Sequence, residues 1–143
     1  MSAATLFGLA LAPLYAAIAQ VESDDGKTSE NIYQIDEGVS DTAIGSYVCD
    51  VNRIVLRLAK EGRWRTTPKF THEDVMSRVR SERMMLYYWF WWGREYQKKT
   101  GRKVSYEILA RIHNGGPIGW KKEGTVKYWN KVRNELLKKG IDK

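Results

Sequence analysis

A run of seven large apolar residues, from Leu86 to Trp92 (LYYWFWW), is the feature that most constrains how this chain can fold. Successive residues of an α-helix point about 100° apart, so a run of this length covers every face of a helix. A helix that is apolar all round is buried among its neighbours. The run lies inside a helical pattern that begins near Thr71 and ends near Thr100-Gly101. The sequence therefore predicts a long central helix, whose inner face carries Val75, Val79, Met85, Trp89, Trp92 and Tyr96.

Four other segments share the helical spacing of apolar residues and predict shorter helices around this one. They span about residues 13–22, 47–61, 105–112 and 125–139, and glycines follow the last three of them. Residues 23–46 are rich in Asp, Gly, Ser and Thr and predict an irregular lobe or a small β-hairpin. The expected inward-facing residues of the helices are Leu14, Ile18, Val21, Val48, Val51, Val55, Leu58, Val126, Trp129, Val132 and Leu136.

The chain of 143 residues, 43% hydrophobic, is long enough for one compact core, and we expect a single domain over residues 1–143. The fold class expected is mainly α, of α+β type, with about five helices and the acidic lobe near the N-terminus. Ala3–Ala19 is uncharged and rich in Ala and Leu, which is typical of a core helix or of an export signal. No basic residue precedes it and Pro13 interrupts it, which favours the helix. Residues 1–12 are expected either to belong to this domain or to form a poorly packed or targeting extension.

Charge is distributed very unevenly along the chain. Residues 1–50 hold one basic and eight acidic residues, a net charge of −7, whereas residues 51–143 carry +14. A basic body of this kind suits a polyanionic partner, and the acidic part suggests chemistry that depends on carboxylates. One cysteine and two histidines exclude a disulfide framework and give no metal-binding spacing, so we expect neither a metal nor another cofactor.

Glu22 is the carboxylic acid that the sequence singles out. It ends an apolar helix, where partial burial raises the pKa of a carboxyl group by disfavouring its charged form. A glutamic acid that stays protonated near neutral pH can act as a general acid. The alternative is that Glu22 only caps or solvates the end of its helix.

Two blocks of sequence carry a resemblance to a known family: QVES, ending in Glu22-Ser23, and ARIHNGGPIGWKK, from Ala110 to Lys122. Together with KYWNKV, which begins at Lys127, they resemble the invertebrate-type (destabilase) lysozymes and related lysozyme-like endolysins and lytic transglycosylases of phages and bacteria. The resemblance implies a lysozyme-like fold and cleavage of the β-1,4 bond between N-acetylmuramic acid and N-acetylglucosamine, with Glu22 as the acid. Secreted members of the family are rich in cysteine, and this chain has a single one, Cys49.

The resemblance leaves the second carboxylate open. If Tyr33-Gln34-Ile35 corresponds to the glutamine motif of the family, Gln34 and Tyr33 line the cleft. If Gly45 corresponds to its glycine, the partner of Glu22 is Asp36, Glu37 or Asp41, and we favour the last two as catalytic candidates.

The late glycine-rich turn supplies further candidates for substrate binding. His113 is expected to be packed or to form part of the cleft wall, and Asn114, Gly115 and Gly116 are expected to line the cleft. The alternative for the two glycines is a helix cap followed by Pro117. One or two members of the aromatic run, such as Tyr87 or Trp91, could stack on sugar rings.

The expected partner is peptidoglycan, an anionic polymer, and no nucleic acid is expected. The expected state is a monomer that does not insert stably into membranes. The resemblance suggests a protein made in the cytoplasm of a bacterium or a phage-infected cell and acting on the cell wall, with its export route open. Two alternatives remain: a basic helical nucleic-acid-binding protein, favoured by the pI near 9.5, and an inactive wall-binding or virion component of lysozyme fold.

Overall fold

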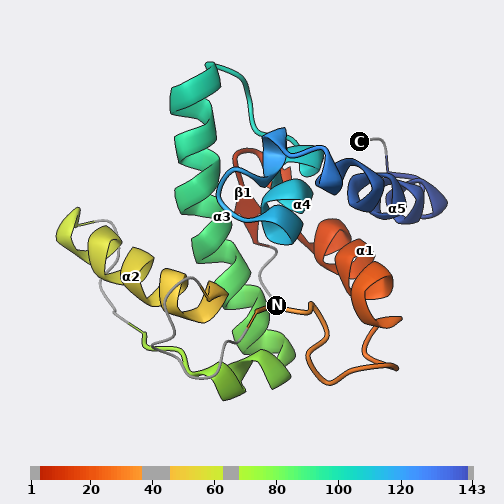
Figure 1. Ribbon diagram of the computed structural model, residues 1–143, viewed down its shortest axis with the longest axis horizontal. Coiled ribbons are helices and arrows are strands. Elements are labelled where there is room, and N and C mark those ends of the chain that lie inside the picture. The colour runs from red at the N-terminus through yellow and green to blue at the C-terminus, as the bar shows by residue number, and fades with distance from the viewer. Residues whose placement is uncertain (1–3, 37–45, 63–67, 142–143) are drawn as a thin grey trace.

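The computed structural model describes residues 4–36, 46–62 and 68–141 of the chain (Figure 1). Within these residues the fold is mainly helical, with one small antiparallel sheet near the N-terminus, so the expected fold class is confirmed. The elements are β1 (Thr5–Leu6), β2 (Leu9–Ala10), α1 (Ala12–Ser23), α2 (Tyr47–Lys60), the 3-10 helix η1 (His72–Met76), α3 (Arg78–Thr100), α4 (Tyr106–Gly115), the 3-10 helix η2 (Gly119–Lys121) and α5 (Gly124–Lys138).

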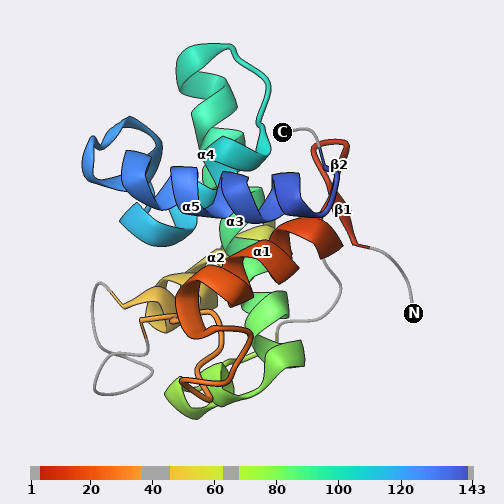
Figure 2. The ribbon, with the colours of Figure 1, turned by 90° about the vertical axis from the view of Figure 1, so that its right-hand side faces the viewer.

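The helix α3 forms the spine of the molecule, as the aromatic run predicts (Figure 1). Tyr87, Tyr88 and Trp89 are buried, and the rest of the run is packed against the same core. The indole Nε1 of Trp89 donates a hydrogen bond of 2.8 Å to the carbonyl oxygen of Leu109, which joins α3 to α4. The helix α2 packs on another side of α3, while α1 and α5 lie against each other beyond α4 (Figure 2). None of the described helices is long and apolar enough to span a membrane.

Local sequence signals explain where most helices begin and end. Pro13 lies in the first turn of α1, where its missing N–H costs nothing. The hydroxyls of Ser46, Ser77 and Ser105 accept hydrogen bonds from backbone N–H groups in the first turns of α2, α3 and α4. Gly101 ends α3 at a φ of 68°, a conformation that glycine adopts without strain.

The long helix begins later than the sequence predicts. Residues 72–76 form η1, and Ser77, in extended conformation, separates it from α3. The carboxylate of Asp74 accepts a hydrogen bond of 2.8 Å from the N–H of Thr71, so Thr71, the predicted start of the long helix, caps the 3-10 turn instead. Val79, expected to face inward, lies in the first turn of α3 after this break and is 72% exposed. Val126 is likewise 42% exposed, because Tyr128 takes the inward position in α5.

The β-hairpin lies in a different place from the one expected. No strand occurs in the described residues of the acidic lobe, 23–36, whereas residues 5–10 form the antiparallel pair β1–β2. Phe7 at its turn packs so closely on α3 that a Cβ on Gly93 would lie 2.6 Å from the ring. Leu11 is fully buried. The described part of residues 1–12 is therefore packed against the core and does not form a loose extension.

The acidic lobe is fixed to the helices by polar contacts. The buried hydroxyl of Ser23 donates to the carbonyl oxygen of Ile32 at 2.7 Å and accepts from the N–H of Gly26 at 2.9 Å. The phenol of Tyr33 donates to the carboxylate of Glu82 on α3. Burial of Tyr33 and Ile35 completes the attachment. This arrangement holds the lobe beside the C-terminal end of α1, where Glu22 lies.

Candidate active site

The carboxyl group of Glu22 lies in the last turn of α1 and is mostly withdrawn from water, with 17% of the side chain exposed. Burial raises its pKa from the ordinary 4.5 to about 7, and the hydroxyl of Tyr128 and the charge of Lys131 act in the opposite direction. Glu22 therefore still carries a proton in a large fraction of molecules at neutral pH. The expectation that the helix end desolvates this group is confirmed.

His113 of α4 lies beside Glu22 and is itself buried. Its Nε2 is 3.6 Å from a carboxylate oxygen of Glu22 and 2.7 Å from the carbonyl oxygen of Tyr33. Because a carbonyl only accepts, Nε2 carries the proton, and Nδ1 is then the acceptor for the hydroxyl of Tyr47 at 3.3 Å. Burial lowers the pKa of His113 to about 4. Between about pH 4 and 7 Glu22 is thus protonated, while His113 is neutral with its one ring proton on Nε2.

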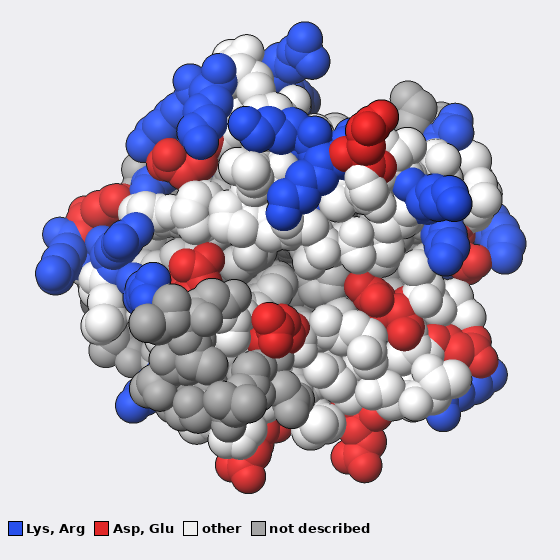
Figure 3. Space-filling model, in the orientation of Figure 1, with Lys and Arg blue, Asp and Glu red and all other residues white. Residues whose placement is uncertain are grey.

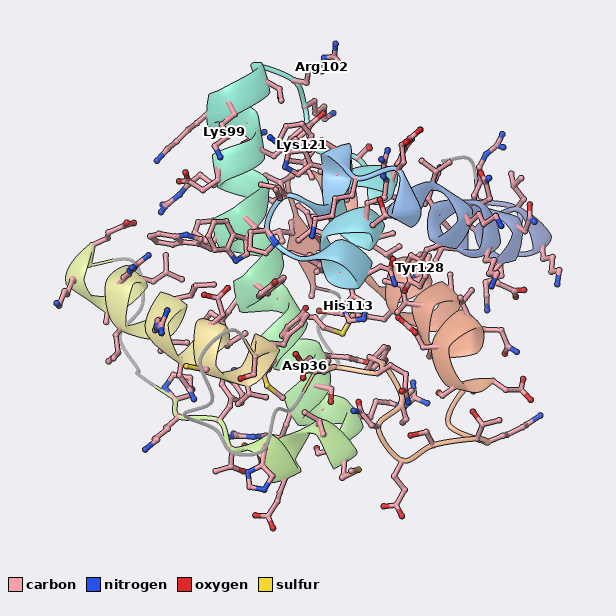
Figure 4. All side chains as sticks on the ribbon, in the orientation of Figure 1. Asp36, Lys99, Arg102, His113, Lys121 and Tyr128 are labelled. Carbon is pink, nitrogen blue, oxygen red and sulfur yellow. The ribbon has the colours of Figure 1, made fainter. Side chains whose placement is uncertain are left out.

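Tyr128 of α5 closes the other side of Glu22. Its hydroxyl is buried and makes no hydrogen bond of normal geometry within the described residues, but it lies near enough to the Glu22 carboxyl to act on its pKa. Figure 4 shows His113 between Tyr128 and Asp36, on the face of the molecule turned to the viewer. Helices α1, α4 and α5 thus each contribute one member to this group of titratable side chains.

Two tyrosine rings, Tyr47 of α2 and Tyr88 of α3, lie on the α2 side of His113. The ring of Tyr47 stacks on that of Tyr88, with centroids 3.9 Å apart. Tyr88 also lines a hollow of about 190 Å³ with Ser46, Asp50, Arg53 and Pro117. Asp50 accepts a hydrogen bond of 2.9 Å from the indole of Trp92, and burial raises its pKa.

The face of the molecule that carries His113 and Asp36 is hollowed, and acidic side chains lie beside the hollow. Figure 3 shows a depression across the middle of this face, with Asp and Glu side chains beside it. Most Lys and Arg side chains of the face lie away from the depression, over the outer ends of the helices. Among the described residues, no three of the types His, Cys, Asp and Glu gather closely enough to hold a metal ion.

The glycine-rich turn after α4 is held by internal packing. Gly116 caps α4 at a φ of 90°, as the alternative for this turn predicts. A Cβ on Gly115 would lie 2.5 Å from the methyl group of Thr125, and one on Gly119 would lie 2.0 Å from the carbonyl oxygen of Arg111. These glycines therefore let η2 and α5 approach α4, which places Tyr128 opposite His113.

Arg111 secures the same junction through its three guanidinium nitrogens. Nε donates to the hydroxyl of Thr125 at 2.8 Å, and one terminal nitrogen donates to the carbonyl oxygen of Lys122 at 3.0 Å. The other pairs with Glu107 one helical turn earlier. The hydroxyl of Thr125 in turn donates to the carbonyl oxygens of Gly119 and Lys122. The block that carries the resemblance is thus the joint between α4 and α5.

The other residues predicted for substrate binding lie in different places. Asn114 is exposed at the end of α4. The side chain of Gln34 is exposed and folds back to the carbonyl oxygen of Asn31 at 2.8 Å. Tyr33 is buried, and it is its carbonyl group that takes part in the site. Glu37 and Asp41 lie outside the described residues.

Sequence reasoning missed Tyr47 and Tyr128. Tyr128, Val132 and Leu136 are four residues apart, a spacing that places them on one helix face and could have identified Tyr128. Tyr47 follows the helix cap Ser46, and its role depends on the distant His113, so no local signal marks it.

Comparison with known proteins gives short matches to lysozymes of invertebrates. The chain is 43% identical over 42 residues to a lysozyme of Ostrea edulis, covering 29% of this chain and 31% of the relative. It is 45% identical over 40 residues to a lysozyme of Meretrix lusoria, covering 28% and 33%. It is 59% identical over 27 residues to invertebrate-type lysozyme 6 of Caenorhabditis elegans, covering 19% and 20%.

The chain spans about a third or less of the length of these curated relatives. No family model matches it, and no solved structure matches it. The resemblance to the invertebrate-type lysozymes that the sequence motifs indicate is confirmed by these matches. It accompanies a mainly helical fold and a buried glutamic acid with a raised pKa.

Proposed function

We propose that this protein is a lysozyme-like glycosidase that cleaves the β-1,4 bond between N-acetylmuramic acid and N-acetylglucosamine in peptidoglycan. The observation that carries the proposal is the largely buried carboxyl of Glu22, which lies 3.6 Å from the buried ring of His113 and whose pKa burial raises to about 7. Glycoside cleavage needs such a group, because the departing oxygen must receive a proton. The matched lysozymes support the same class of reaction.

Glu22 donates its proton to the glycosidic oxygen, the bond from that oxygen to the anomeric carbon breaks, and positive charge develops on the sugar ring. His113 and the carbonyl group of Tyr33 hold the wall of the site beside Glu22. Neutral His113 places no positive charge next to the acid, so it does not favour the early loss of the proton. After cleavage the hydroxyl of Tyr128 stabilises the Glu22 carboxylate.

A second carboxylate would stabilise the developing charge or activate water in a hydrolase, and a lytic transglycosylase would use Glu22 alone as acid and then base. Glu37 and Asp41 remain the proposed candidates, and Asp36 joins them. The carbonyl group of Asp36 accepts a hydrogen bond of 3.1 Å from the N–H of Tyr47. Asp36 thus lies on the same face as His113 (Figure 4).

The direct test is loss of turbidity of purified peptidoglycan with wild type, Glu22→Gln and Glu30→Gln. Glu30 is an exposed carboxyl of the same lobe, so its variant controls for the change in net charge. Wild type and Glu30→Gln should clear the suspension, and Glu22→Gln should lose activity by at least about a hundredfold, the usual contribution of a general acid. An inactive wild type, or an active Glu22→Gln, contradicts the proposal. The product mass then separates the two reactions, because the anhydro product of a transglycosylase lacks one water.

A further inference from the structure

An open groove of about 660 Å³ lies between α1 and α5, outside the group of side chains around Glu22. Val21 of α1 and Leu137 of α5 supply its apolar part. Its polar lining comes entirely from α5: Lys131, Asn134, Glu135 and Lys138. Figure 2 shows the two helices that form its walls lying side by side. This volume is in the range of small-ligand sites.

The groove begins next to the proposed general acid. Val21 directly precedes Glu22, and Lys131 lies one helical turn after Tyr128. The charge of Lys131 acts on the carboxyl of Glu22, which places its ammonium group within electrostatic reach of that carboxyl. The groove therefore adjoins Glu22 along both α1 and α5.

The groove keeps one positive charge without a matching carboxylate. Lys138 pairs with Glu135 at 3.0 Å, so these two charges offset each other. Lys131 makes no ion pair within the described part of the chain, and it is exposed. While Glu22 is protonated it carries no charge and does not neutralise Lys131. The amide of Asn134 adds two N–H donors beside it.

We propose that this groove binds a carboxylate carried by the muramic acid unit of the substrate, with Lys131 as its cation and Asn134 as a hydrogen-bond donor. The inference rests on the proposed function and adds a specificity to it. The carboxylate is either that of the lactyl group or one of the peptide stem attached to it. Polymers of N-acetylglucosamine alone have no such group, so the groove distinguishes muramic-acid-containing glycan from chitin.

The test uses soluble glycan strands in four forms. Three are peptidoglycan strands: with acetylated peptide stems, with the stems removed to leave the lactyl carboxylate, and with the stem carboxylates converted to amides. The fourth is a chitin oligosaccharide. Wild type is compared with Lys131→Met and with Lys99→Met, which removes an exposed charge at the distant end of α3 (Figure 4). Rates are measured at pH 5.5, where Glu22 is protonated whether or not Lys131 is present.

We expect Lys131→Met to raise KM about threefold to fivefold on at least one of the two strands that bear a carboxylate, the stem-bearing or the stripped one. This is the range for one exposed ion pair, and kcat should be unchanged. The substitution should leave KM unchanged on the amidated strand and on chitin, and Lys99→Met should behave as wild type throughout. A larger effect on stem-bearing strands identifies the stem as the source, and a larger effect on stripped strands identifies the lactyl group. Equal KM changes on charged and amidated strands, or none, overturn the inference while leaving the proposed reaction intact. A wild type that cleaves no strand overturns the proposed reaction itself.

Discussion

Replacing Glu22 by Gln should make the protein more stable at alkaline pH while it removes activity. The pKa of the Glu22 carboxyl is about 7 in the folded protein and about 4.5 when it is fully solvated in the unfolded chain. Below pH 4.5 the group is protonated in both states and has no effect on the difference between them. Between pH 4.5 and 7 the folded state retains a proton that the unfolded chain has lost, so stability falls as the pH rises. Glutamine is uncharged at every pH and avoids this loss.

The magnitude follows from the size of the shift. Each pKa unit corresponds to about 1.4 kcal/mol, so the ionised Glu22 lowers the free energy of unfolding by about 3 kcal/mol above pH 7. The gap between Glu22→Gln and wild type should widen from below about 1 kcal/mol at pH 5 to about 3 kcal/mol at pH 8. Any difference in packing between Glu and Gln adds the same offset at every pH, so the widening is the quantity to measure.

The assay is urea unfolding of both proteins at one-unit steps from pH 5 to pH 8. The protonation of His113 occurs near pH 4 in the folded state and from about pH 6.5 downwards in the unfolded chain. It changes both proteins alike and is removed by taking the difference. Glu30→Gln, at an exposed position of the same lobe, is the control for the loss of one carboxyl group. A gap for Glu22→Gln that stays constant with pH would refute the claim that the fold desolvates this carboxyl.

The remaining predictions concern the surroundings of Glu22. Activity should decline as the pH rises through about 7, and in Tyr128→Phe this decline should move to higher pH, because the lost hydroxyl stabilises the ionised form. A pH profile that does not move, or that moves to lower pH, contradicts this role of Tyr128. Gly119→Ala should lower the free energy of unfolding by about 2 to 4 kcal/mol in urea titrations, since its Cβ would meet the carbonyl group of Arg111 at 2.0 Å. Gly124→Ala, with open space around the new Cβ, should cost nothing or add about 0.5 to 1 kcal/mol. Equal effects of the two glycine variants would contradict the packing account of the turn.

The sequence predicts the helices well because their signals are local. Apolar spacing and the glycines that follow identify α2, α4 and most of α3, and the all-apolar run identifies α3 as central. The break at Ser77 is missed because a capped 3-10 turn and a capped α-helix begin with the same residues. The hairpin at residues 5–10 is missed because it is stabilised by Phe7 packing on Gly93, a contact between distant parts of the chain.

In the candidate site, too, the residue with a local sequence signal is predictable and its distant neighbours are not. Glu22 is identifiable because a carboxyl at the end of an apolar helix has a local reason to be desolvated. The groups that surround it come from three other places in the chain: the lobe, α4 and α5. Their meeting depends on tertiary packing, which no spacing within a single helix reveals.

The sequence left two alternatives for the glycine-rich block, a lining of the cleft or a helix cap, and the structure favours the cap. Gly116 caps α4, and Gly115 and Gly119 allow the close approach of α5 and η2, so neither is needed to contact a ligand. That close approach sets the position of Tyr128 against Glu22 and, one turn later, of Lys131 at the groove. A bulkier residue at Gly119 would therefore disturb both the proton on the acid and the cation beside it. The motif acts on the site through the packing of two helices, and this explains how residues without functional groups can accompany the proposed catalytic glutamic acid.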